Sequence, residues 1–244
     1  MSGHSKWATI KRKKAATDSK RGKIFTKLIK ELIIAARDGG GDSDANPRLR
    51  QAISTAKTAN MPNDNINRAI QKGTGELEGI NYEEFTYEGY GPGGVALFME
   101  VLTDNKKRTV SEIRHLMHKY GGKLGENGSV SWMFEKMGQI TVSTNGHDED
   151  LVFEEALEAG ADNFSNSNGE YLITTFPSET VNVSDSLTAK GYAVTSTAVE
   201  MVPKNVMKVE GNDVNRLMIL MEALEENEDI QNLYSNLDVD EEDL

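Results

Sequence analysis

The period of the hydrophobic pattern changes at Gly75, and this change constrains the fold more than any other feature of the sequence. Before Gly75, apolar residues recur every three or four positions, which is the spacing of one helix face. After it, short apolar runs bounded by glycine turns alternate with further helical segments. The pattern predicts an α+β multidomain protein: an N-terminal all-helical domain is followed by two ferredoxin-like α+β domains, the third domain being inserted into the second.

Three amphipathic helices are predicted within the first domain, residues 1–78. The first covers residues 23–37 and ends at a triple glycine. Asn46 caps the second, with proline at its first helical position. The third starts at residue 63 or 64 and is closed by Gly73. These helices can bury one apolar side each and so form a small helical core.

The second domain is predicted to be split, with residues 79–137 at one end and residues 205–244 at the other. A β-hairpin surrounds the Gly-Pro-Gly-Gly turn at 91–94. A helix over 108–120 and a strand over 129–134 follow. An amphipathic helix over 213–224 and a strand over 230–234 would complete the same sheet. The acidic end, from Asp238 onward, is expected to be a solvated tail; a weaker alternative is that it competes with nucleic acid for the basic N-terminal segment.

Residues 138–204 carry a complete pattern of their own. Strands over 139–143, 171–176 and 192–202, with a weaker one near 163–165, alternate with helices over 148–159 and 178–190. The resulting order β-α-β-β-α-β is that of a ferredoxin-like unit. We therefore expect an inserted third domain.

Charge is distributed unevenly along the chain. The first thirty residues hold ten Lys or Arg and one acid, Asp18, whereas the whole chain has a net charge of −12. The remaining residues must therefore carry about −21. A basic segment on an acidic body predicts that polyanions bind at one end of the molecule.

The basic segment has no apolar face that could be buried. A helix starting near Lys6 would point its cations to nearly every side, and the alternative is a frayed, solvated terminus. Contact with phosphates is favoured over base stacking, because Trp7 is the one aromatic residue in residues 1–22. The candidate nucleic-acid-binding residues here are Lys6, Trp7, Lys11, Arg12, Lys13, Lys14, Lys20, Arg21, Lys23 and Lys27.

Two further polar stretches are candidates for the same interface. The connector 60–66 leads to Arg68 and Lys72; it either contacts a partner or only joins two helices. Residues 104–108 either hold a phosphate at a helix N-terminus or form an exposed turn and cap. The candidate residues from these stretches are Asn65, Arg68, Lys72, Lys106, Lys107 and Arg108.

Several other classes of protein are disfavoured. The chain has no cysteine, so disulfides and thiolate chemistry are absent. The Gly-rich stretch 89–94 lacks the Lys-Ser/Thr of a P-loop and fits a hairpin turn better. His115 and His118 have metal-ligand spacing on one helix, but no further ligand is singled out, and surface histidines are the favoured interpretation. We predict no catalytic residue, no metal, no cofactor, no membrane span and a cytoplasmic location.

Seven blocks of sequence resemble the YebC/PmpR family. They are G-H-S-K-W at 3–7, K-R-G-K-I-F-T-K-L at 20–28, M-P-N-D-N-I-N-R-A-I at 61–70, Y-E-G-Y-G-P-G-G-V-A at 87–96, N-K-K-R-T-V-S-E-I-R-H at 105–115, G-S-V-S-W-M-F at 128–134 and Q-N-L-Y-S-N at 231–236. The resemblance implies three domains. It also implies a kinship with probable transcriptional regulators that bind DNA and with mitochondrial translational activators, and a ribosomal role has been proposed for bacterial members.

Three functions follow as hypotheses. The first is a DNA-binding transcriptional regulator, although no clear recognition helix is evident. The second is a ribosome- or rRNA-associated translation factor. The third is a protein-interaction scaffold, which leaves the charge asymmetry unexplained.

Overall fold

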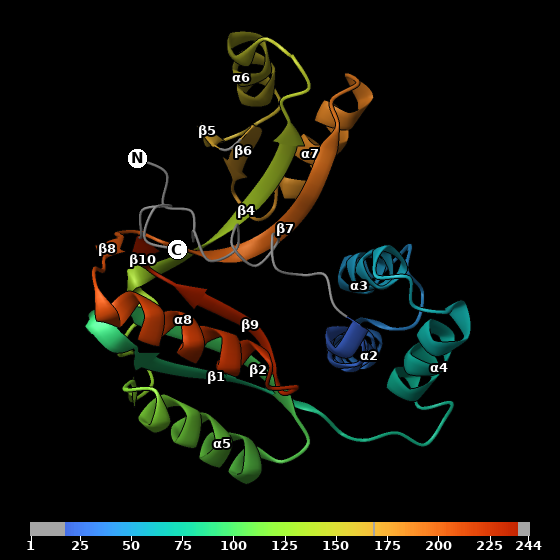
Figure 1. Cartoon of the computed structure of the whole chain (residues 1–244). Coiled ribbons are helices and arrows are strands. Elements are labelled where there is room, and N and C mark those ends of the chain that lie inside the picture. The colour runs from blue at the N-terminus through green and yellow to red at the C-terminus, as the bar shows by residue number, and fades with distance from the viewer. Residues whose placement is uncertain (1–17, 168, 239–244) are drawn as a thin grey trace. The chain divides into compact units, whose positions relative to one another are not determined.

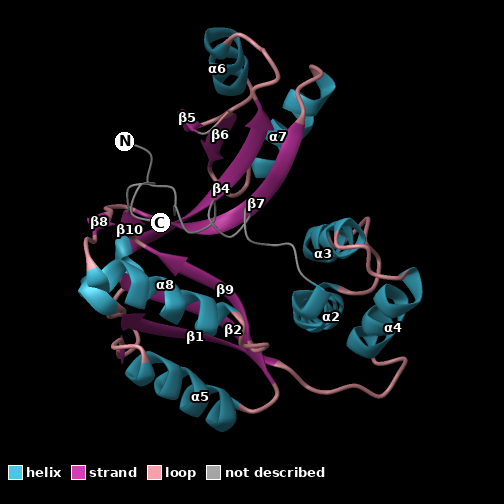
Figure 2. Ribbon diagram, viewed as in Figure 1, coloured by secondary structure: helices cyan, strands magenta, loops and turns pink. Residues whose placement is uncertain are grey.

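The computed structural model describes residues 18–167 and 169–238 (Figures 1 and 2). The helix expected near Lys6 and all but the first residue of the expected acidic tail lie outside these ranges. The α+β class is confirmed, with helices first and strand-containing parts after them. Residues 132–206 form one compact unit, and the described residues before and after it form another. The insertion predicted at 138–204 lies within the first of these.

Three helices begin the described chain: α2 (Asp18–Gly39), α3 (Pro47–Thr58) and α4 (Asn63–Thr74). Asn46 caps α3 by accepting a hydrogen bond from the Leu49 N–H, and its amide donates to the Ala35 carbonyl at 2.7 Å. The same side chain therefore starts α3 and ties it to α2. The helices share one core, which contains Leu32, Ile33, Ala36, Leu49, Ala52, Ala56, Met61, Ile66 and Ala69.

Helix α4 continues one residue beyond Gly73, which was expected to close it. The residue with a left-handed backbone is Gly75, at φ 83°. Gly73 is helical and lies directly against α2: a methyl group there would overlap the Ile33 carbonyl and come within 2.7 Å of the Ala36 Cβ. Glycine at this position allows the two helix backbones to approach.

The first sheet has the strand order β3-β1-β2-β9, with all neighbours antiparallel. Its strands are β1 (Glu83–Tyr90), β2 (Ala96–Thr103), β3 (Lys123–Leu124) and β9 (Ile230–Ser235). The predicted hairpin is β1 and β2, joined by the 3-10 turn Pro92–Gly94. Helices α5 (Lys106–Lys119) and α8 (Asn212–Glu225) pack on one face of this sheet and share its core with Leu97, Met99 and Val101.

The strand predicted over residues 129–134 is wrong except at its end. Residues 131–133 form a 3-10 turn, and β4 begins only at Phe134. The reason is Glu88, whose buried carboxylate accepts hydrogen bonds from the backbone N–H groups of Gly128, Val130 and Ser131 at 2.7–2.8 Å. Because three backbone N–H groups of residues 128–131 point to the same carboxylate, this segment cannot adopt the extended conformation of a strand. The same bonds lower the pKa of Glu88 even though burial opposes them.

The second sheet has the order β5-β6-β4-β7. Its elements, in chain order, are β4 (Phe134–Ser143), α6 (Glu149–Glu158), β5 (Asn163–Ser167), β6 (Glu170–Thr175), α7 (Thr180–Ala189) and β7 (Val194–Pro203). Each of the two βαβ connections has another strand between its strands, which is the ferredoxin-like arrangement. The short strands β8 (Met207–Lys208) and β10 (Leu237–Asp238) pair in parallel, so Asp238 belongs to a strand.

We expect Gly73→Ala to lower the free energy of unfolding by about 1–3 kcal/mol, because overpacking against the α2 backbone outweighs the gain in helix propensity. Gly22→Ala is the control, since a methyl group there meets nothing within 4 Å. That variant should gain about 0.5–1 kcal/mol. Urea unfolding measures both, and equal stabilisation of the two variants would contradict the proposed packing of α4 on α2.

Candidate nucleic-acid interface

The predicted interface residues fall into three groups. Lys6, Trp7, Lys11, Arg12, Lys13 and Lys14 lie outside the described residues. Lys20 and Arg21 belong to the first turns of α2. The others are placed on α2, α4 and the start of α5, and each element uses its charges differently.

Three lysines of α2 at successive helical turns contact the end of α8 and the connection that follows it. Lys23 pairs with the Glu226 carboxylate at 3.4 Å, and the Lys27 ammonium donates to the Glu225 carbonyl at 2.7 Å. Lys30 reaches Asp229. A cation at the carbonyl end of a helix is stabilised by the helix dipole. The i, i+4, i+7 spacing of these lysines therefore forms a face that docks within the protein.

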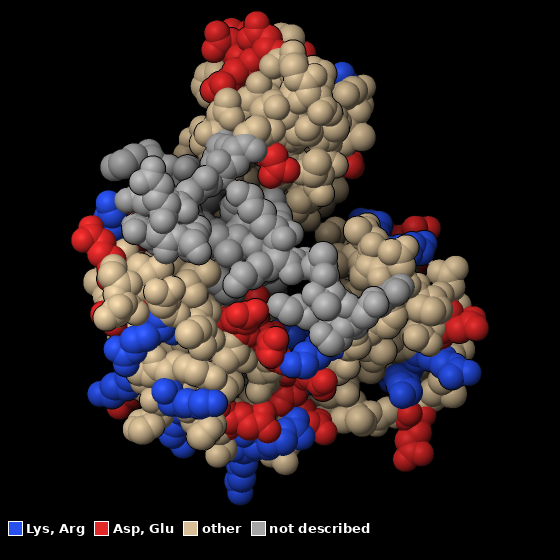
Figure 3. Space-filling view, in the orientation of Figure 1, with Lys and Arg blue, Asp and Glu red and all other residues tan. Residues whose placement is uncertain are grey.

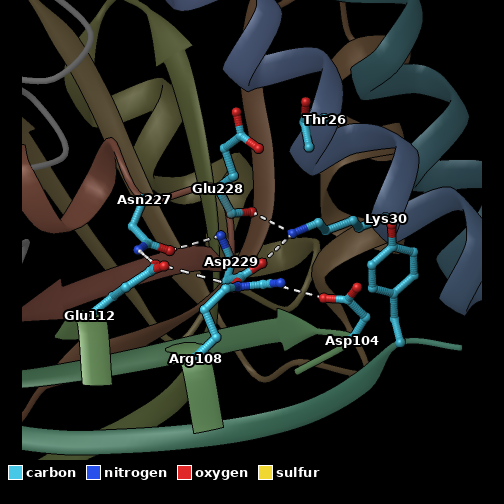
Figure 4. A pocket seen from close by; sticks show the side chains of 9 residues that line it. Thr26, Lys30, Asp104, Arg108, Glu112, Asn227, Glu228 and Asp229 are labelled. Carbon is cyan, nitrogen blue, oxygen red and sulfur yellow. Dashed lines mark hydrogen bonds and ion pairs between the residues drawn. The ribbon is translucent and has the colours of Figure 1, made fainter. Parts of the chain in front are cut away.

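The contact of Lys30 with Asp229 is buried on both sides. The ammonium and carboxylate lie 2.5 Å apart, with side chains only 7% and 6% exposed. Lys30 also donates to the Glu228 carbonyl at 3.0 Å (Figure 4). The other carboxylate oxygen of Asp229 accepts from Thr109 at 2.6 Å and from Arg108 at 2.9 Å. Such complete hydrogen bonding offsets the cost of removing two charges from water.

Asp229 remains ionised well below the usual range of a carboxyl group. Burial alone would raise its pKa, but the hydrogen bonds from Lys30, Thr109 and Arg108 lower the pKa to about 2. The Asp229 carboxylate is thus shared by two cations, Lys30 of α2 and Arg108 of α5.

A pocket of about 380 Å³ opens beside this network. Its wall includes Thr26, Lys30, Tyr82, Asp104, Arg108, Glu112, Asn227, Glu228 and Asp229. Figure 4 shows that its cations already point to carboxylates: Arg108 contacts both Asp104 and Asp229. A phosphate entering the pocket would meet four acidic residues and two basic ones. Among the described residues no group of three or more His, Asp or Glu is placed to hold a metal ion.

The predicted residues of helix α4 lie beside its buried face rather than on it. Ile66 and Ala69 are buried, whereas Arg68 and Lys72 are exposed and Asn65 is half-buried. Neither Arg68 nor Lys72 has an ion-pair partner within the described part of the chain. These two side chains can therefore contact an external anion without breaking an internal bond.

Residues 104–108 were expected to hold a phosphate or to form an exposed turn and cap, and the structure shows a cap at the start of α5. Asn105 accepts a hydrogen bond from the Arg108 N–H at 3.1 Å. The Arg108 side chain turns toward Asp229, and the Lys106 ammonium lies 4.3 Å from the centre of the Phe85 ring. Lys107 is exposed to solvent. Of the three predicted cations, Lys107 alone has no such contact among the described residues.

The sequence did not predict that Lys30, Thr109 and Asp229 form one buried network. The spacing of Lys23, Lys27 and Lys30 could have indicated a common helix face. No sequence feature near Lys30 could have indicated its partner, because Asp229 lies 199 residues further along the chain.

Fold and charge together define a multidomain α+β protein with a basic helical domain and a buried ionic network. Among the described residues, no helix has both the length and the apolar character needed to cross a bilayer. Comparison with known proteins then specifies the family.

Two family models match nearly the whole chain. The TACO1/YebC N-terminal domain matches residues 5–76, and the TACO1/YebC second and third domain matches residues 82–237. The chain therefore belongs to the TACO1/YebC family, which confirms the resemblance seen in the sequence.

Two named relatives and one solved structure match nearly the whole length of this chain. A "Probable transcriptional regulatory protein" of Syntrophus aciditrophicus is 55% identical over 243 residues, covering 99% of this chain and 97% of the relative. One of the same name from Geobacter sulfurreducens is 51% identical, covering 100% and 98%. The crystal structure of a conserved hypothetical protein from Aquifex aeolicus superimposes with a TM-score of 0.84 at 42% identity, covering 93% of this chain and 94% of that one.

Asp229→Asn should destabilise the protein by about 3–5 kcal/mol, since it leaves the buried Lys30 ammonium without its counter-charge. Lys30→Met should cost less, because Arg108 and Thr109 still neutralise and bond Asp229. Chemical unfolding of both single variants and of the double variant measures the coupling. Additive effects would show that the two side chains do not interact.

The same pair predicts an acid-dependent stability. Because the folded pKa of Asp229 is about 2 and the unfolded value is about 3.9, its contribution is complete above about pH 5 and is lost progressively as the pH falls toward 2. The unfolding midpoint of the native protein should therefore fall more steeply between pH 4 and 2 than that of Asp229→Asn. Parallel pH profiles would contradict this assignment.

Proposed function

We propose that this chain is a non-enzymatic, cytoplasmic nucleic-acid-binding regulator of gene expression, in the first place a DNA-binding transcriptional regulator. The observation that supports it most is the segregation of charge. Residues 1–80 hold sixteen basic and eight acidic residues, whereas residues 81–244 hold eleven basic and thirty-one acidic ones. The names of relatives more than 50% identical over the full length support the same role.

Phosphate neutralisation is the physical basis of the proposal. Lys and Arg displace the counterions condensed on nucleic acid, and this provides affinity that depends on salt but little on sequence. The contacts are assigned to the segment from Lys6 to Arg21 and to Arg68 and Lys72 on α4. Lys23, Lys27 and Arg108 are held in internal contacts and contribute less.

A ribosome-associated translation factor is the second candidate. The observation that favours it is the acidity of residues 132–206, which hold twelve acidic and three basic residues. Figure 3 shows acidic side chains gathered at the α6 end of this unit. A ribosome offers both RNA and basic proteins, so one target could satisfy both signs of charge.

The decisive experiment compares the intact chain with the variant Lys11→Ala, Arg12→Ala, Lys13→Ala, Lys14→Ala. The matched control removes four lysines elsewhere: Lys136→Ala, Lys190→Ala, Lys204→Ala, Lys208→Ala. We expect the first variant alone to bind duplex DNA more weakly, with a salt slope reduced by about 0.9 for each phosphate that is no longer neutralised. Fluorescence anisotropy at several salt concentrations measures both quantities.

Sucrose-gradient sedimentation of lysate separates the two candidates. A transcriptional regulator should stay in the light fractions and prefer duplex DNA to rRNA, whereas a ribosomal factor should sediment with ribosomes. If the first variant binds DNA and RNA as tightly as the intact chain at every salt concentration, both candidates fail.

A further inference from the structure

Helix α5 exposes a stripe of basic and polar side chains to solvent. Lys107, Ser111, Arg114 and His118 follow one another at helical spacing, and all are exposed. Thr109, Ile113 and Met117 are buried on the opposite side of the helix. This exposed stripe contains no acid.

Three further cations extend the stripe at the C-terminal end of α5. Lys119 is the last residue of the helix, and Lys123 follows on the edge strand β3. The guanidinium of Arg216, on α8, lies against Gly121 so closely that a methyl group there would overlap it. We call Lys107, Arg114, His118, Lys119, Lys123 and Arg216 the α5 basic face; in Figure 3, Lys and Arg side chains gather over α5.

Acidic side chains do little to neutralise this face. Residues 106–123 hold six Lys or Arg and one acid, Glu112. The Glu112 carboxylate turns to the pocket, where it accepts a hydrogen bond from Asn227 at 2.9 Å (Figure 4). Asp213 pairs with Arg216 at 3.3 Å, and this is the one ion pair that the face makes within the described ranges.

The charges also oppose the local preference of the helix. Basic residues in a first turn are disfavoured by the positive end of the helix dipole, and α5 has three of them with no acid. The charge of Arg108 is balanced by ion pairs with Asp104 and Asp229, and the Lys106 ammonium makes a cation–π contact with the Phe85 ring. Lys107 has no such partner among the residues described. The positive charge of Lys107 in the first turn is therefore unfavourable for the helix and is not compensated within the described residues. Such a locally unfavourable charge is typical of a site that contacts an external ligand.

We infer that the α5 basic face is a second phosphate-contacting surface, which binds the sugar-phosphate backbone of the nucleic acid held by the N-terminal domain. The inference rests on the proposed function. It extends the nucleic-acid contact from the helical domain to helix α5, which covers the first sheet. Lys107 and His118 are separated by about 16 Å at 1.5 Å per residue. Duplex DNA carries a charge every ~1.7 Å of axis, so a helix of this length lies beside several phosphates. The face has no Asn or Gln, and this favours backbone contact over base recognition.

The test uses the variant Lys107→Ala, Arg114→Ala, Lys119→Ala in the full chain. All three positions are exposed on a helix, where alanine is well tolerated. Its control, Lys136→Ala, Lys190→Ala, Lys204→Ala, changes the net charge by the same amount in residues 132–206. Anisotropy titrations with a duplex DNA and with an RNA hairpin, each over about 50–200 mM salt, determine affinity and salt slope.

We expect the α5 variant to bind at least about tenfold more weakly at 0.1 M salt, with the slope for duplex DNA reduced by about three, while the control matches the intact chain. An unchanged affinity and slope would overturn the inference. So would weaker binding with an unchanged slope, since that indicates a folding defect. If the α5 variant binds normally while the N-terminal variant fails, the proposed function stands without this surface; if both bind normally, the proposed function fails too.

Discussion

The buried ion pair between Lys30 and Asp229 is the interaction on which the arrangement of the helices and the first sheet depends. It joins the middle of α2 to the loop that leads into β9, and the same carboxylate bonds Thr109 and Arg108 of α5. The backbone of Asp229 adds a further bond, from the Leu102 N–H at 2.8 Å. The partners of this buried charge therefore come from α2, from α5 and from the strand before α5, and together they offset the cost of burying it.

Some cations of the helical domain make internal contacts, whereas others face solvent. Lys23, Lys27 and Lys30 hold the end of α8 and its connection to β9, and Arg48 bonds Glu31 and Glu84. Arg68 and Lys72 face solvent. An excess of positive charge in the sequence therefore overstates the charge available to a ligand, because internal acids neutralise part of it. The cations that we assign to nucleic acid within the described residues are Arg68 and Lys72 on α4 and, on our inference, the α5 basic face.

Much of the fold could be predicted from local sequence signals. Asn46 with the following proline predicted the start of α3, and the glycine turn at 91–94 predicted the β1–β2 hairpin. The alternation of periods predicted the ferredoxin-like strand order of the second sheet. The buried charges could not be predicted: Glu88 organises a loop about 40 residues away, and the partner of Lys30 is 199 residues away. A lysine or glutamate in a helix or strand pattern is normally exposed, and only the tertiary structure shows which ones are not.

Amide hydrogen exchange with and without a bound duplex tests most directly the claim that cationic surfaces contact the nucleic acid while the acidic remainder does not. The account predicts slower exchange in the N-terminal segment, in α4 and in α5, with no change over residues 132–206. Protection confined to residues 132–206, or none in the helical domain, would contradict it.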